Sequence, residues 1–257
     1  KTMIKRAMLM TAVTAILILA AQMAAAYTIT TGSSYGPYQS GQGGEFTLQA
    51  DHALQSILAG YVSGTTSDIK QQNPLSSTPQ PGTFQSFCLE KDEHLYTGAS
   101  YSVTISNQAN GGGQNTNFGD PISIGTAYLY SHFNRGSLSG YQYGTESQRE
   151  TSAAALQHAI WYLENEETYA DAGGASNIFL NAVLTQFGSL ENADDDSNGA
   201  YGIKVASLWV PGHEGDLSYA RQDQLIATPI PAAVWLLASG LIGLTAFRRR
   251  PVNGSGC

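Results

Sequence analysis

The sequence predicts an α+β fold in which an antiparallel β-sandwich or barrel-like sheet carries a central helical insertion of two to three helices. Residues 45–49 and 101–105 alternate apolar with polar side chains, which is the period of half-buried strands. Residues 84–89 and 203–210 also have strand-like composition. Strands near both ends with helices between them favour α+β over a repeating βαβ design.

Three segments in the middle of the chain predict helices, over residues 124–134, 147–166 and 176–187. The second is rich in alanine and free of proline, and Leu156, Ile160 and Leu163 recur at helical spacing. Gln157 lies beside that stripe, on the side shared with Trp161, four residues on. We therefore expect the Gln157 amide at the edge of the core, where it needs partners. Ser176 is the expected N-cap of the third helix, and Gly188 its stop.

Residues 1–26 predict a cleavable secretion signal. Lys1, Lys5 and Arg6 form a basic start, residues 7–21 are apolar, and Ala24 and Ala26 supply the small side chains of a cleavage site. A membrane anchor is the alternative, but this apolar run is short compared with the roughly 20 residues of a spanning helix. We expect signal peptidase to remove the segment.

Residues 229–250 predict a membrane-embedded sorting signal, followed by a short tail over residues 251–257. Sixteen uncharged residues, 232–247, stand between a proline pair and an arginine cluster. The signal residues are Pro229, Pro231, Arg248, Arg249 and Arg250. The basic cluster resists translocation, which keeps that end in the cytoplasm. A permanent single-span anchor is the alternative.

This pattern resembles the PEP-CTERM sorting signal, with Ile230 where the family has glutamate. The resemblance implies a Gram-negative bacterium that makes exopolysaccharide, and an exosortase that processes the tail near the prolines. It also implies a precursor tethered to the inner membrane, then a product at the cell surface or in the extracellular matrix.

Between the two signals, residues 27–228 form a single expected domain with a strongly acidic composition. The domain holds six basic and twenty acidic residues, a formal net charge of −14. Binding of nucleic acid needs a basic face, which six dispersed cations do not provide. Asp194, Asp195, Asp196 and Asn198 followed by glycine have the spacing of a calcium loop, but an EF-hand glutamate is absent. We expect a solvated acidic turn, with no metal and no cofactor.

Cys88 is the one cysteine of that domain, because Cys257 lies beyond the sorting signal. A domain with a single cysteine cannot form an internal disulfide. It is therefore a buried thiol that acts as a small hydrophobe, a partner in an intermolecular disulfide, or a reactive group.

Phe87-Cys88, followed about seventy residues later by Gln157 and Trp161, is similar to the TQxA-type thioester domains of bacterial surface adhesins. Leu156 departs from that family, which has threonine before the glutamine. The resemblance implies an internal thioester between Cys88 and Gln157 that captures an amine once, so the protein is not an enzyme in the ordinary sense.

His158 and Trp161 are the expected supporting residues, although His94 and His132 could also accept a proton from the amine. The expected ligand is an amine-bearing surface molecule or the exopolysaccharide. The alternative function is a non-covalent structural or carbohydrate-binding component of the exopolysaccharide matrix. A secreted hydrolase that uses paired carboxylates is a third reading, with no motif to support it.

Overall fold

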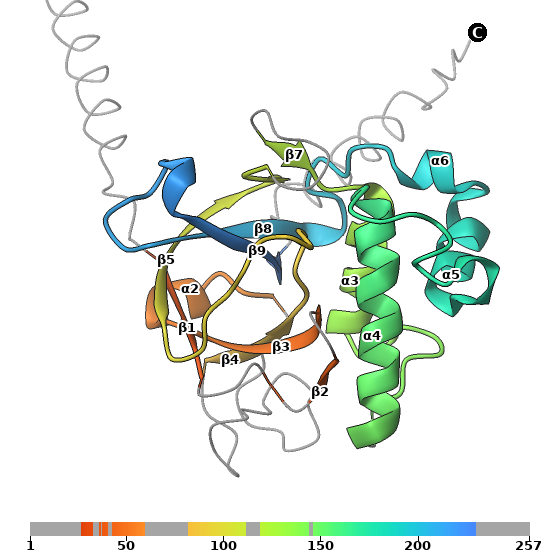
Figure 1. The fold of residues 1–257 in the computed structure, drawn as a ribbon, viewed down its shortest axis with the longest axis horizontal. Helices are drawn as coiled ribbons and strands as arrows, with labels where there is room; N and C mark the ends of the chain where they lie inside the picture. The colour runs from red at the N-terminus through yellow and green to blue at the C-terminus, as the bar shows by residue number, and fades with distance from the viewer. Residues whose placement is uncertain are drawn as a thin grey trace, which may run out of the picture.

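The computed structural model describes residues 27–32, 36, 38–40, 43–59, 82–111, 119–143 and 146–229 (Figure 1). The predicted signal peptide lies outside these residues, as do Pro231 and the arginines at 248–250 of the predicted sorting signal. Within the described part of the chain, no helix has the length and apolar character needed to cross a membrane.

The strands are β1 (Tyr27–Thr31), β2 (Tyr38–Ser40), β3 (Gly43–Ala50), β4 (Thr83–Ser86), β5 (Ser100–Ser106), β6 (Gln108–Ala109), β7 (Asp120–Pro121), β8 (Ile203–Trp209) and β9 (Ala220–Ala227). The α-helices are α2 (His52–Gln55), α3 (Ile124–Asn134), α4 (Glu146–Leu163), α5 (Ile178–Phe187) and α6 (Leu190–Ala193).

The main sheet is antiparallel and curls until its two ends meet. Its strand order is β2-β3-β1-β5-β8-β9, with β4 also paired to β3. Just after β4, the Leu89 N–H donates to the Asp223 carbonyl of β9 at 3.1 Å, and the Leu225 N–H donates to the Phe87 carbonyl at 3.0 Å. Cys88 stands opposite Gln224 in this bridge. The α+β prediction is confirmed, with the barrel-like form of the sheet.

Helices α3 to α6 lie together beside the curled sheet, and α4 runs along it (Figure 1). The three predicted helices are confirmed as α3, α4 and α5, and the short α2 and α6 are additional. The prediction for the second helix was three residues too long. Asn165 has a left-handed φ of 60°, and the Glu166 N–H donates to the Trp161 carbonyl at 2.7 Å. These features end α4 as a C-terminal cap does, so the helix stops at Leu163.

The predicted N-cap of α5 was wrong by one residue. Asn177, rather than Ser176, precedes the helix, and its Oδ1 accepts from the Phe179 N–H at 3.0 Å. Ser176 instead ends a short 3₁₀ turn. Gly188 ends the helix in the left-handed conformation, as predicted.

Two hydrophobic clusters form the core, one between the sheet and the helices and one inside the curled sheet. Leu156, Ile160 and Leu163 of α4 belong to the first cluster, as their spacing predicts. Trp161 lies outside that stripe and packs in the second cluster, together with Cys88. Helix α4 therefore contributes to both clusters.

A buried ion pair holds the first half of α4 against β3. Arg149 is fully buried, and its Nε donates to Glu45 Oε2 at 2.8 Å, while its Nη2 bonds the other carboxylate oxygen. The Tyr141 hydroxyl donates to Glu45 Oε2 at 2.6 Å, and the guanidinium lies 3.9 Å from the centre of the Tyr38 ring. Loss of one partner from such a pair leaves an uncompensated charge in the interior.

We therefore expect Arg149→Met to lower the free energy of unfolding by about 3–5 kcal/mol, measured by urea denaturation. Arg135→Met is the matched control, because Arg135 is an exposed arginine at the end of α3. A loss in Arg149→Met no larger than that in the control would contradict a stabilising role for the ion pair.

Glu164 joins the end of α4 to the start of α3. Its Oε1 accepts from the Ser123 hydroxyl at 2.9 Å and from the Ser123 N–H at 3.2 Å. Burial raises the pKa of Glu164 from 4.5 to about 7, and these hydrogen bonds oppose the rise. The folded chain therefore binds this proton more tightly than the unfolded chain does.

The contribution of Glu164 to the free energy of unfolding should consequently be fully present below pH 4.5. It should be lost as the pH rises to about 7. The shift corresponds to a loss of about 3 kcal/mol across that window. We expect Glu164→Gln to flatten the fall, measured as the free energy of unfolding against pH. Burial also raises the pKa of Asp223 to about 7, so some slope should remain. Glu191→Gln, at an exposed position, should leave the profile unchanged.

Candidate functional site

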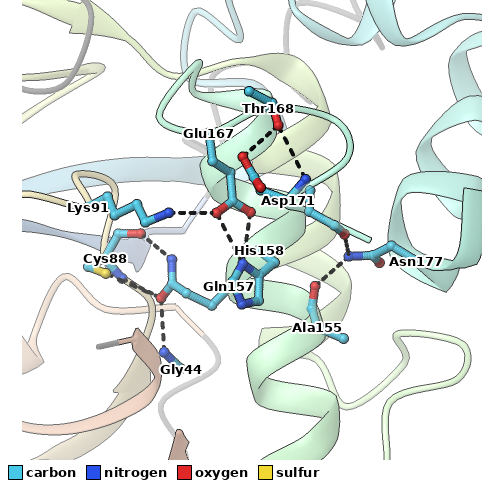
Figure 2. Close-up of polar contacts among 11 residues, drawn as sticks. Gly44, Cys88, Lys91, Ala155, Gln157, His158, Glu167, Thr168, Asp171 and Asn177 are labelled. Atoms are coloured by element: carbon cyan, nitrogen blue, oxygen red, sulfur yellow. Dashed lines mark hydrogen bonds and ion pairs between the residues drawn. The ribbon is translucent and has the colours of Figure 1, made fainter. Parts of the chain in front are cut away.

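Cys88 and Gln157, which lie 69 residues apart in the sequence, are in direct contact in the fold (Figure 2). The Cys88 thiol donates to Gln157 Oε1 at 3.3 Å, and the Cys88 N–H donates to the same oxygen at 3.3 Å. Gln157 Nε2 donates to the Cys88 carbonyl at 2.8 Å. The glutamine side chain thus bonds both backbone groups of Cys88, which fixes its carboxamide against the sulfur.

A glycine pair at the start of β3 completes the contact. The Gly44 N–H donates to Gln157 Oε1 at 3.3 Å, which makes it the second backbone donor on that oxygen. Gly44 has a φ of 116°, a conformation that suits glycine. A Cβ atom on Gly43 would come within 2.6 Å of both Gln157 Cγ and Trp161 Cη2. Gly43 therefore lets the Gln157 and Trp161 side chains lie against the strand.

Two backbone N–H groups that converge on one carbonyl oxygen have the arrangement of an oxyanion hole. If Cys88 Sγ attacks Gln157 Cδ, negative charge develops on Oε1, where both donors already point. The distances are 3.3 Å in the unreacted amide, and such bonds shorten as charge develops.

The surroundings of the sulfur keep it protonated. Cys88 is fully buried and Gln157 is 1% exposed. Burial raises the pKa of the Cys88 thiol well above its ordinary value, and the Glu90 carboxyl raises it further. Glu90 is itself buried, and burial and the neighbouring Asp223 raise its pKa. The thiol is therefore neutral, and the side-chain amide that it contacts is that of Gln157.

Trp161 and its neighbours lie beside the pair. The Trp161 side chain is buried, and its indole N–H has no hydrogen-bond acceptor among the described residues. The Lys91 ammonium lies 5.5 Å from the centre of the indole, and the His158 ring meets the indole edge to face, with centroids 5.5 Å apart. The predicted supporting residues His158 and Trp161 therefore do lie at the site.

A chain of polar contacts runs from Lys91 through Glu167 to His158 (Figure 2). Lys91 Nζ lies 3.1 Å from Glu167 Oε2, and His158 Nδ1 lies 2.8 Å from Glu167 Oε1. The backbone N–H of Lys91 also donates to Glu166 Oε2 at 3.1 Å. These contacts fix the chain after α4 against the segment that follows Cys88.

The other predicted residues lie apart from this site or outside the described residues. His132 is on α3, where its Nδ1 contacts the Ser137 hydroxyl at 3.2 Å, and His94 is exposed. Pro229 is exposed beyond β9, and its predicted partners in the sorting signal are not described. In the described part of the chain, no group of three or more His, Cys, Asp or Glu residues could hold a metal ion.

The predicted site did not include Gly43, Gly44, Lys91 and Glu167. A glycine pair within a strand pattern does signal a close approach of another group to the backbone, so Gly43 and Gly44 carried a usable signal. Lys91 and Glu167 carried none, because isolated charges near a loop are ordinary solvated residues and only the tertiary fold brings these two together.

We expect Gly43→Ala to force Gln157 and Trp161 away from β3 and to lower the free energy of unfolding by about 1–3 kcal/mol. Gly98→Ala is the comparison for backbone strain without a steric contact, because Gly98 has a φ of 70° but its added methyl would meet no atom within 4 Å. Urea denaturation of both variants measures the two effects separately. A loss in Gly43→Ala below about 1 kcal/mol would show that the close packing is not needed.

Comparison with known proteins identifies no relative of this chain. No protein-family model, curated protein or solved structure matches the chain. The contacts around Cys88 and Gln157 are therefore the starting point for a function.

Proposed function

We propose that this protein is an exported surface or matrix protein that attaches covalently to an amine-bearing ligand through a thioester between Cys88 and Gln157. One observation carries the proposal. The Cys88 thiol lies 3.3 Å from the Gln157 side-chain oxygen, and two backbone N–H groups converge on that oxygen in a buried site. The donors satisfy the buried amide, and the contact with the thiol places that amide beside a nucleophile.

Thioester formation balances without any cofactor. Cys88 Sγ forms a bond to Gln157 Cδ, the bond from Cδ to Nε2 breaks, and the thiol proton leaves with the nitrogen as ammonia. The Cys88 and Gly44 N–H groups stabilise the tetrahedral intermediate. Loss of ammonia from a buried site makes the step difficult to reverse.

The product is an activated acyl group, because a thiolate is a better leaving group than an amide nitrogen. An amine that reaches Cδ of residue 157 forms an amide there and returns the thiol to Cys88. The ligand then stays bound through a covalent bond, so each molecule reacts once. This outcome suits attachment to a surface or a matrix rather than turnover.

Export is the second part of the proposal, and it is supported by the sequence of the terminal segments. Signal peptidase would recognise the basic and apolar start of the chain. An exosortase would recognise the proline pair and the final arginine cluster. We propose a transient inner-membrane tether, followed by display at the cell surface or in the exopolysaccharide matrix.

Intact mass spectrometry of the purified exported protein tests the thioester. We expect a mass short by one ammonia, and no alkylation of Cys88 in the folded or the rapidly unfolded protein. Methylamine should restore an alkylatable Cys88 and appear as a methylamide on residue 157, located by peptide mapping.

Cys88→Ser and Gln157→Glu are the matched controls, because the first replaces the sulfur of the proposed bond, the second replaces the amide nitrogen that would leave as ammonia, and both nearly preserve the size of the side chain. Both should have their full mass and incorporate no methylamine. A wild-type protein with full mass and an alkylatable Cys88 would refute the thioester. Binding to the producer's own exopolysaccharide that survives Cys88→Ala would then favour the non-covalent matrix component.

A further inference from the structure

His158 combines access to solvent with a fixed ring orientation. Its side chain is 42% exposed, whereas its sequence neighbour Gln157 is buried. Its Nδ1 lies 2.8 Å from Glu167 Oε1, and the ring rests edge to face on Trp161. No described residue forms a hydrogen bond with Nε2. One ring nitrogen is therefore held by a carboxylate, and the other is available to a molecule that arrives from solvent.

Glu167 is placed to hold that ring. Its side chain is 1% exposed, although it stands after the end of α4 in a chain segment at the surface. One carboxylate oxygen lies 2.8 Å from His158 Nδ1, and the other lies 3.1 Å from Lys91 Nζ. A buried carboxylate on Nδ1 selects the tautomer with the proton on Nδ1, which leaves Nε2 as a proton acceptor.

We propose that His158 is the general base for attack by the incoming amine, and that Glu167 is the positioning residue that orients its imidazole. This inference rests on the proposed thioester and names the residues that make it reactive. Lys91, with its ammonium against both Glu167 and Trp161, fixes the carboxylate at the other side.

The step moves one proton from nitrogen to sulfur. The amine lone pair forms a bond to Cδ of residue 157, and the bond from Cδ to Cys88 Sγ breaks with its electron pair on sulfur. His158 Nε2 takes a proton from the attacking nitrogen, and Glu167 stabilises the imidazolium. The imidazolium then returns a proton to Cys88, so the imidazole ends as it began and the thiol is restored.

The test uses two amines that differ in their need for a base. Methylamine is an ammonium ion at neutral pH, whereas hydroxylamine is mostly neutral. We expect His158→Gln to slow methylamine incorporation roughly 100-fold and to slow the hydroxylamine reaction by less than about tenfold. Glu167→Gln should shift the ratio of the two rates in the same direction, by roughly tenfold. Rates are followed by intact mass on the full exported protein.

His132→Gln is the matched control, because His132 is a partly exposed helix histidine whose Nδ1 contacts a hydroxyl instead of a carboxylate. It should leave both rates unchanged. Each variant must retain the mass deficit of one ammonia, which shows that it folds and closes the thioester.

The outcomes separate the two proposals. A deficit that persists in His158→Gln and Glu167→Gln, with the ratio of the two rates as in wild type, overturns this inference and leaves the thioester in place. An equal slowing of both amines also overturns it, because it indicates a structural effect. A wild-type protein without the deficit overturns the thioester and this inference with it.

Discussion

The docking of α4 on the first residues of β3 is the contact on which the rest of the structure depends. Arg149 pairs with Glu45 near the start of the helix, and Gln157 reaches Gly44 about two turns later. Trp161 then enters the interior of the sheet. The two polar anchors fix both the rotation of α4 and its position along its axis. A shift by one residue would turn Gln157 about 100° away from the sulfur.

The curl of the sheet supplies the other half of the site. Cys88 stands where the segment after β4 meets β9, with its backbone in an antiparallel bridge to Gln224. Phe87 and Leu89 pack toward the helices, whereas Cys88 faces the interior cluster with Trp161. Alternation along this extended segment therefore directs the Cys88 thiol to one face, and the large side chains of its two sequence neighbours to the other face. The backbone on either side of Cys88 is thereby anchored, and the sulfur contacts Gln157 Oε1.

Electrostatics connects the proposed bond with the proposed base. Burial and Glu90 raise the pKa of the Cys88 thiol, so the same surroundings would make an unprotonated sulfur a poor leaving group. The proposed thioester would be stable while water alone is present, and it would open when a proton is delivered with the nucleophile. His158 would offer that proton transfer from the exposed side, where Glu167 holds its ring and Lys91 holds Glu167. Reactivity would then be limited by access and by proton delivery.

Much of the fold followed from local patterns. The stripe of Leu156, Ile160 and Leu163 predicted the buried face of α4, and alternation predicted the strands around residues 45–49 and 101–105. Periodicity suffices for such elements because each must bury one face. Strand β9 was missed because it begins with four residues, Ala220 to Asp223, of which three are polar and which show no apolar alternation. Asp223 and Gln224 are nevertheless buried, because partners from distant segments surround them.

The sequence by itself determined the residue types that could react, a single domain cysteine and a glutamine beside a helical apolar stripe. It also determined the acidic composition, and it predicted export and sorting signals in the terminal segments. Only the tertiary structure decided that Cys88 and Gln157 touch, that Gly44 completes the pair of donors, and that Glu167 holds His158. The reason is physical. Local spacing sets which face of a helix or strand a side chain occupies, whereas the curl of the sheet and the docking of α4 set which faces meet.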